Sequence, residues 1–403
     1  MAHRMNVALC APGEIYGGVE RFVHTLATYL RDETDVRPLV VLFEEGTHSR
    51  TLREAGVETV VIQPRWKYDV LVIRKLVHLF KTREIDVVHT SGYKATILAT
   101  AAAKLCGIGT VKTEHGRLEP GNPYSVGHLR MRFNLLADRT VTHTCVDHVV
   151  YVTHDLKSCM LRNGKAGRSS VIHNGIVPIH TDAHPFPSDI DRNAFNIGIV
   201  GRLDEVKGHR SLLAALTRLS DLPRIAVNVI GEGALRSELE RYSRQEQLTG
   251  RVKFLGFREN IHDYMRAFDV LAMPSLYEGL PYTLLEGMYL RRPVIASNVG
   301  GLREVLQDKV DALLVEPGNV DRLAEAIRYL YQNDAERTHL AENARRKICE
   351  RFMISTMAEQ YIEVFHRVSR KSDTERRTIG VPRQEIAMPS PGHKTRTSSE
   401  IER

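Results

Sequence analysis

The class of fold is decided by the first unit of the chain, residues 6–30, with the sequence NVALCAPGEIYGGVERFVHTLATYL. Residues 7–11 are continuously apolar and predict a buried strand over 6–11, and a loop containing Gly17 and Gly18 follows. After the loop, apolar residues recur at helical spacing. A buried strand, a glycine loop and an amphipathic helix in direct succession are typical of a parallel sheet covered by helices.

The same alternation continues through most of the chain. Further strands are predicted at 39–43, 57–62, 86–90, 109–114, 148–153 and 170–173, and a second series at 195–200, 225–230, 252–255, 270–274, 293–297 and 312–315. We therefore expect two doubly wound, Rossmann-like α/β domains. Their predicted bounds are 1–180 for the first domain, 181–192 for a proline-bearing linker, 193–352 for the second domain, 353–370 for a closing helix and 371–403 for a disordered tail. Whether the closing helix crosses back to the first domain is left open.

Composition and charge narrow the classes of protein. The chain has 403 residues, of which 42% are hydrophobic and 26% charged, so disordered and fibrous classes are excluded. The net charge of +7 is concentrated in residues 1–180, where 23 lysines and arginines face 17 aspartates and glutamates, a net of +6. This predicts an anionic partner, either a phosphate-bearing acceptor or an anionic membrane surface. No basic-aromatic motif predicts nucleic acid as a partner.

Cysteine usage and the absence of long apolar runs predict the compartment. The five cysteines are scattered and show no C-x-x-C spacing, which argues against a disulfide framework or a thiolate zinc site. The first residues lack the pattern of a signal peptide, and no run approaches the roughly 20 apolar residues of a membrane span. We expect a cytoplasmic protein, either soluble or peripheral on the inner face of the membrane.

Residues 273–291, MPSLYEGLPYTLLEGMYLR, carry the strongest indication of chemistry. A strand ends there, the loop SLYEG follows, and a helix is predicted to begin with Pro281 in its first turn. The amides after Gly279 and the positive end of that helix form an anion site at the carboxyl edge of a sheet. Glu278 and Glu286 are too far apart to bind one small group but can contact two ends of an extended ligand, such as a nucleotide-sugar.

A second segment, residues 198–209, supplies cations. A strand leads to Arg202, and Lys207 follows five residues later. Cations at this place can neutralise the charge that develops on a departing diphosphate, a task that a metal performs in other sugar-transferring folds. We therefore expect no metal and no cofactor beyond a nucleotide-diphosphate sugar donor.

These motifs resemble those of one family. EGLPYTLLE at 278–286 is similar to the E-x7-E motif of the family-4 (group 1) retaining glycosyltransferases, and GRLDEVKGH at 201–209 resembles their donor-binding arginine and lysine loop. Shorter matches are GGVER at 17–21, TEHG at 113–116, HNGI at 173–176, VIGEG at 229–233 and FLGF at 254–257. The resemblance covers about residues 5–365.

The resemblance implies a glycosyltransferase B fold, with two Rossmann-like domains facing a cleft, and a retaining, metal-independent reaction. A hexose-type sugar would pass from a nucleotide-diphosphate sugar to a glycan or lipid-linked acceptor in cell-surface polysaccharide or glycolipid synthesis. The implied catalytic residues are His115, Glu278, Arg202 and Lys207. The implied donor-site residues are Gly17 and Gly18 near the phosphates, Arg202 and Lys207 on the diphosphate, Glu286 on the ribose, Phe257 beside the base, and Asn174, Glu232, Gly279 and Leu280.

Several alternatives stay open or are disfavoured. Glu114 is a rival to His115, and a sugar-phosphate synthase would share the same donor site. An NAD-dependent dehydrogenase needs G-x-G-x-x-G, which fails because Arg236 stands in place of the last glycine. The histidines at 143, 148 and 154 match no zinc signature. The D-x-D at 189–191 has the spelling used by metal-dependent sugar transferases, but it falls in the predicted linker and not at a buried strand end. Residues 64–81 are either an ordinary helix packed on the sheet or a basic amphipathic patch on an anionic membrane.

Overall fold

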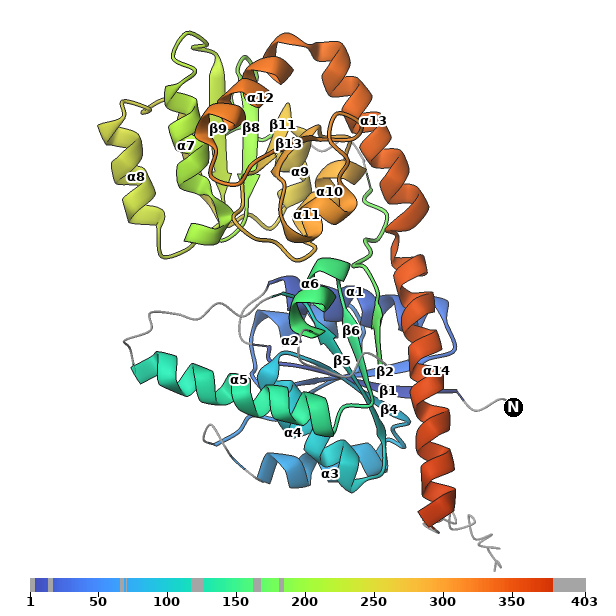
Figure 1. Ribbon diagram of the computed structural model, residues 1–403. Coiled ribbons are helices and arrows are strands. Elements are labelled where there is room, and N and C mark those ends of the chain that lie inside the picture. The colour runs from blue at the N-terminus through green and yellow to red at the C-terminus, as the bar shows by residue number, and fades with distance from the viewer. Residues whose placement is uncertain are drawn as a thin grey trace, which may run out of the picture.

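The chain folds around two parallel sheets, as the alternation of strands and helices predicts. The structure is a computed structural model and describes residues 4–13, 17–65, 69, 71–116, 126–161, 168–180 and 185–379. The sheets form two lobes, which lie one above the other in Figure 1. We call the lobe of the earlier residues the first lobe and the other the second lobe.

The sheet of the first lobe has the strand order β3-β2-β1-β4-β5-β6-β7, and all its described pairs are parallel. Its strands are β1 (Asn6–Ala11), β2 (Arg37–Leu42), β3 (Thr59–Val61), β4 (Val87–Ser91), β5 (Gly109–Glu114), β6 (His148–Tyr151) and β7 (Ser169–Val171). Its helices are α1 (Gly18–Glu33), α2 (Thr47–Glu54), α3 (Leu71–Thr82), α4 (Tyr93–Leu105), α5 (Val126–Thr144) and α6 (His154–Met160). The strand order reverses direction between β1 and β4, where open α/β sheets bind ligands.

The second lobe repeats this plan with the strand order β10-β9-β8-β11-β12-β13, again parallel in its described pairs. Its strands are β8 (Phe195–Val200), β9 (Ile225–Ile230), β10 (Val252–Gly256), β11 (Val270–Met273), β12 (Val294–Ser297) and β13 (Leu313–Val315). Its helices are η3 (Glu205–Lys207), α7 (His209–Thr217), α8 (Arg236–Gln245), α9 (Ile261–Arg266), α10 (Tyr282–Tyr289), α11 (Gly300–Val305), α12 (Val320–Gln332) and α13 (Asp334–Arg351). The strand order reverses between β8 and β11, next to the two segments that carry the predicted site.

The last helix, α14 (Ile354–Ile379), returns to the first lobe, where it packs against β4, β5 and α1 (Figure 1). A short backbone ladder starts the crossing, since Ile176 N donates to Phe352 O at 3.0 Å and Ile354 N donates to Ile176 O at 2.9 Å. The prediction of a disordered tail from residue 371 is wrong for residues 371–379, which extend α14. The helix continues because no helix-breaking residue occurs before Gly380 and Pro382. Residues 380–403 lie outside the described part.

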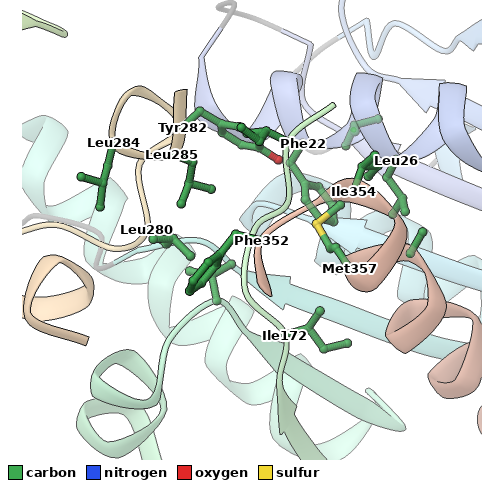
Figure 2. Close-up of a cluster of buried hydrophobic side chains, with 14 of the residues drawn as sticks. Phe22, Leu26, Ile172, Leu280, Tyr282, Leu284, Leu285, Phe352, Ile354 and Met357 are labelled. Atoms are coloured by element: carbon green, nitrogen blue, oxygen red, sulfur yellow. The ribbon is translucent and has the colours of Figure 1, made fainter. Parts of the chain in front are cut away.

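One apolar cluster joins the two lobes (Figure 2). It combines Phe22 and Leu26 of α1 with Leu280 and Tyr282 of the second lobe, and with side chains at the start of α14. Burial of each such side chain stabilises the folded state by about 1.5–3 kcal/mol. The lobes therefore share part of one hydrophobic core.

The described part of the predicted linker packs against the second lobe. Ile190 is buried, and Asp189 accepts hydrogen bonds from Arg258 Nη2 and from the Tyr264 hydroxyl, both at 3.0 Å. Residues 181–184 lie outside the described residues. Asp189 is thus engaged by side chains of the second lobe.

Most of segment 64–81 forms helix α3. Its apolar side chains Val72, Leu76 and Phe80 are buried in the core of the first lobe, while Arg74 and Lys75 are exposed. This agrees with an ordinary helix packed on the sheet, because the apolar side is not available to a lipid surface. Residues 66–68 and 70 fall outside the description. No helix in the described ranges is long and apolar enough to cross a membrane.

His89 makes the stability of the first lobe depend on pH. The side chain is fully buried between the rings of Phe22, Tyr361 and Phe365, and its Nε2 lies 2.7 Å from Thr113 Oγ1. Burial, assisted by the nearby His115, lowers the pKa of His89 to about 3. Between pH 6.5 and pH 3 the unfolded chain therefore binds a proton at this residue that the folded chain does not, so stability falls as the pH falls.

We expect this one group to remove about 2 kcal/mol of unfolding free energy between pH 7 and pH 5. His89→Gln should unfold with a shallower pH dependence than the parent chain in this range. The matched control is His143→Gln, at an exposed position, which should leave the pH dependence unchanged. Denaturant midpoints at pH 7, 6 and 5 measure the effect, and parallel curves for the parent and His89→Gln would refute it.

Candidate functional site

The predicted site residues gather where the carboxyl ends of strands from both sheets face each other. They follow four strands: Gly17 and Gly18 after β1, His115 after β5, Arg202 and Lys207 after β8, and Glu278 after β11. This placement is a consequence of parallel sheets, in which all strands end at the same edge. Loops that are distant in sequence are thereby brought together between the lobes.

Lys207 and Glu278 contact each other directly. Lys207 ends the short helix η3, whose first turn is capped by the Asp204 side chain. Its Nζ lies 2.7 Å and 2.9 Å from the two carboxylate oxygens of Glu278. Ser275 Oγ donates to the same carboxylate at 2.8 Å, and Glu278 is buried. The structure thus joins a cation and an acid that the sequence analysis assigned to different parts of one ligand.

The loop that carries Glu278 is confined between the lobes. A side chain at Gly279 would overlap the carbonyl oxygen of His115, and one at Gly301 would overlap the carbonyl oxygen of Gly279. Gly301 N also donates to Glu278 O at 3.0 Å. Glycine is required at Gly279 and Gly301 because the backbones approach too closely for any Cβ.

His115 is neutral in this environment. Its Nε2 lies 3.1 Å from Ser91 Oγ, and its ring meets Phe22 edge-on with the centroids 4.8 Å apart. Burial lowers the pKa of His115 to about 3. A neutral imidazole has one nitrogen that donates and one that accepts, so it can position hydroxyl groups without adding charge.

Glu114, the rival to His115, takes part in a buried ion cluster. Lys112 Nζ lies 2.5 Å from Glu114 Oε1 and 2.7 Å from Asp138 Oδ2, and the Lys112 side chain is almost completely buried. Burial raises the pKa of Glu114, although Lys112 opposes the shift. The cluster joins β5 to α5 through Lys112 and Asp138, and the Glu114 carboxylate is already occupied by an internal cation.

Glu286 is bound from both lobes. It lies in α10 and is buried, and its Oε2 accepts a hydrogen bond from Arg21 Nη1 at 3.0 Å. Arg21 Nη2 contacts the other oxygen, Oε1, which also lies 3.0 Å from His262 Nε2. Neither Arg21 nor His262 was predicted. Arg21 does occur within the quoted GGVER, directly after the glycine loop, whereas the sequence around His262 gives no comparable indication.

The remaining predicted residues differ in how exposed they are. The Arg202 side chain is 80% exposed and lies 3.2 Å from Asp204, and Phe257 is 61% exposed. Asn174, by contrast, is buried and its Nδ2 donates to Leu280 O at 2.7 Å, across the lobes. Glu232 pairs with Arg236 at 2.5 Å. Arg202 and Phe257 are therefore accessible, whereas Asn174 and Leu280 hold the loop in place.

Pro281 and the glycine loop are the remaining parts of the predicted site. Pro281 is the N-cap residue of α10, so the prediction that it lies in the first turn is off by one position, within the usual uncertainty of helix ends. Gly17 caps α1, and a side chain at Gly18 would meet open space.

In the ranges that the structure describes, no three His, Cys, Asp or Glu side chains are arranged to hold a metal ion. His148, one of the three histidines considered above, lies 3.0 Å from Ser170 Oγ instead.

Two family models match consecutive parts of the chain. The model described as Glycosyltransferase Family 4 matches residues 16–178. The model described as Glycosyl transferases group 1 matches residues 180–347. The two matches together span both lobes.

Curated relatives are glycosyltransferases of several kinds. The chain is 26% identical over 404 residues to the alpha-maltose-1-phosphate synthase of Mycolicibacterium smegmatis, which covers 91% of this chain and 100% of that protein. It is 26% identical over 317 residues to the UDP-Gal:alpha-D-GlcNAc-diphosphoundecaprenol alpha-1,3-galactosyltransferase of Escherichia coli, with 74% and 79% covered. The match to an uncharacterized glycosyltransferase of Methanocaldococcus jannaschii, at 27% identity, covers 54% of this chain and 59% of that relative.

The fold is similar to that of a solved glycosyltransferase. Anabaena Alr3699/HepE, crystallised in complex with UDP-glucose, superposes with a TM-score of 0.77 at 24% identity over 90% of this chain and 99% of that chain. Both lobes and their order are therefore shared. With the two family models and the curated relatives, this shows that the chain belongs to the group 1 glycosyltransferases and is a glycosyltransferase with the glycosyltransferase B fold.

Proposed function

We propose that the protein is a retaining, metal-independent glycosyltransferase that moves a hexose-type sugar from a nucleotide-diphosphate sugar to a glycan or lipid-linked acceptor. The observation that carries this proposal is the contact between Lys207 and Glu278 at the strand ends of the second lobe. An ammonium group beside a buried carboxylate offers one partner for a diphosphate and one for sugar hydroxyls. We place the reaction in the synthesis of cell-surface polysaccharide or glycolipid.

Each proposed role follows from charge and position. Lys207 and the accessible Arg202 neutralise the leaving diphosphate, which replaces the function of a metal. Glu278 stabilises positive charge on the sugar, and Glu286 accepts hydrogen bonds from the ribose. Phe257, being exposed, is free to lie against the base. The neutral His115 positions hydroxyl groups, while the leaving phosphate itself accepts the proton of the acceptor.

A second candidate is a sugar-phosphate synthase with the same donor site. It is favoured by the relative from Mycolicibacterium smegmatis, whose full length the match covers. The two candidates differ in the acceptor. Incubating the enzyme with the nucleotide-sugar and either a free sugar phosphate or a lipid-linked sugar, followed by mass spectrometry of the product, distinguishes them.

An anionic membrane surface remains a proposed partner, at the inner face of the membrane. It rests on the charge of +6 in residues 1–180 and on the exposed basic side of α3. Vesicle co-sedimentation that does not depend on anionic lipid would exclude it.

A thermal-shift screen in the presence of EDTA tests the donor site. We expect one of UDP, GDP or ADP, and its sugar conjugate, to raise the melting temperature, because a ligand that binds the folded state stabilises it. NAD and simple phosphate are the controls and should have no comparable effect. Stabilisation by NAD alone, or by a nucleotide only after a divalent metal is added, would overturn the proposal.

A further inference from the structure

We propose that Arg21 is an internal competitor of the sugar donor. Its guanidinium occupies the Glu286 carboxylate in the structure, and the ribose of the incoming nucleotide must take its place. The inference rests on the proposed function, which assigns Glu286 to the ribose. It adds a residue of the first lobe that sets the affinity of the site and links donor binding to the contact between the lobes.

The first step of the argument is the occupancy of the carboxylate. A carboxylate has about four positions at which it accepts hydrogen bonds. Arg21 contacts both oxygens of Glu286 through its two terminal nitrogens, and His262 occupies a further position on Oε1. A ribose offers two neighbouring hydroxyl groups, whereas these three contacts leave about one acceptor position free. The ribose and the bidentate guanidinium therefore cannot use the carboxylate together.

The second step is accessibility. The Glu286 side chain is 2% exposed, whereas that of Arg21 is 30% exposed. The guanidinium is therefore the part of the pair that solvent and an incoming ligand reach first. It also lies over the ring of Tyr282, 5.4 Å from the ring centroid, so its flat face has a support on the second lobe.

The third step explains why Arg21 can leave. A buried carboxylate that loses every partner is costly, but His262 stays beside Glu286 on the same lobe. Burial, with Arg21 and Arg266 nearby, lowers the pKa of His262 to about 4, so the ring is neutral at pH 7. A neutral ring next to a carboxylate donates its Nε2 hydrogen. Glu286 therefore keeps one hydrogen bond during the exchange.

The fourth step concerns the two lobes. Arg21 lies in the first turn of α1, and 265 residues separate it from Glu286. Its contact is therefore a link between the lobes within the donor site itself. When the ribose displaces the guanidinium, that link is broken, and the nucleotide takes over the space between the lobes.

Nucleoside titrations test the proposal. Uridine, guanosine and adenosine lack phosphates, so they separate the ribose contact from any contact of Arg21 with a diphosphate. We expect Arg21→Met to bind at least one of them about tenfold more tightly than the parent chain, since a charge-assisted competitor is gone. Arg21→Lys keeps the positive charge but loses the two terminal nitrogens that contact both carboxylate oxygens. It should therefore give a smaller gain in nucleoside affinity. Equal or weaker binding by both variants, or no detectable binding of any nucleoside by either, would overturn the proposal.

The matched control is Arg31→Met, in the last turn of the same helix, where the side chain pairs with Asp32 and the Ala55 carbonyl, both of the first lobe. It should bind nucleosides like the parent chain. Small-angle scattering without ligand is the second readout: Arg21→Met should have a larger radius of gyration than both the parent and Arg31→Met, and an unchanged radius would refute the link between the lobes. If Glu286→Gln leaves nucleoside affinity unchanged, it is the ribose role of Glu286, and with it that part of the proposed function, that fails.

Discussion

Lys207→Met is expected to lower kcat/KM for sugar transfer by about 10²–10³, the effect typical of losing one group that stabilises charge in a transition state. In the structure Lys207 Nζ contacts both oxygens of Glu278, and in the proposed reaction it also faces the departing diphosphate. Removing it leaves that charge without its nearest cation. The measurement is steady-state transfer with the donor that the thermal-shift screen identifies.

Two controls make the result specific to the site. Lys253→Met removes a partly buried lysine of the same lobe, whose Nζ donates to Asp189 O at 2.9 Å outside the site, and it should retain near-normal transfer. Lys207→Met also leaves Glu278 with a missing partner and is therefore expected to be less stable. Lys207→Met combined with Glu278→Gln should recover stability and remain inactive. Turnover by Lys207→Met within threefold of the parent would contradict the assigned role.

Tyr361→Ala is expected to destabilise the first lobe by about 3–5 kcal/mol, the range for truncating a large buried aromatic side chain. Tyr361 is fully buried where α14 crosses the first lobe, with its ring close to those of Phe22 and Phe365. Its hydroxyl lies 2.9 Å from Thr113 Oγ1 on β5. The alanine would leave a cavity at the contact between α14 and the first lobe.

Denaturant unfolding followed by far-ultraviolet circular dichroism measures this change. Tyr361→Phe, which loses only the hydroxyl group, should cost about 1 kcal/mol. Tyr329→Ala, at a tyrosine that is 45% exposed, should stay within about 0.5 kcal/mol of the parent. If Tyr361→Ala unfolded like Tyr329→Ala, α14 would not support the first lobe.

The fold was largely predictable because its elements are local. Strands β1 and β8, for example, lie where short, mainly apolar runs predicted them, and α1 follows the glycine loop. The extension of α14 to Ile379 was missed because its last residues, KSDTERRTI, have no apolar side chain periodicity to distinguish a helix from a polar tail. Composition favoured disorder, whereas helix propensity prevailed.

The site was predictable in its positions but not in its contacts. Lys207, Glu278 and Glu286 could be selected because each follows a strand or lies in the helix after it, and the family resemblance assigned their roles. The ion pair of Lys207 with Glu278 was not foreseen. Nor was the neutrality of His115, since its lowered pKa comes from burial by side chains that are remote in sequence.

The sequence by itself determined the two series of strands and helices, the edges at which the functional residues stand, and the family. Side-chain direction follows the backbone period, so the spacing of apolar and polar residues along the chain is enough to predict these features. Only the tertiary structure decided that α14 packs on the first lobe, that Gly279 lies against His115, and that Arg21 occupies Glu286. Such contacts depend on how two independently patterned lobes pack against each other, and no local period of the chain encodes that arrangement.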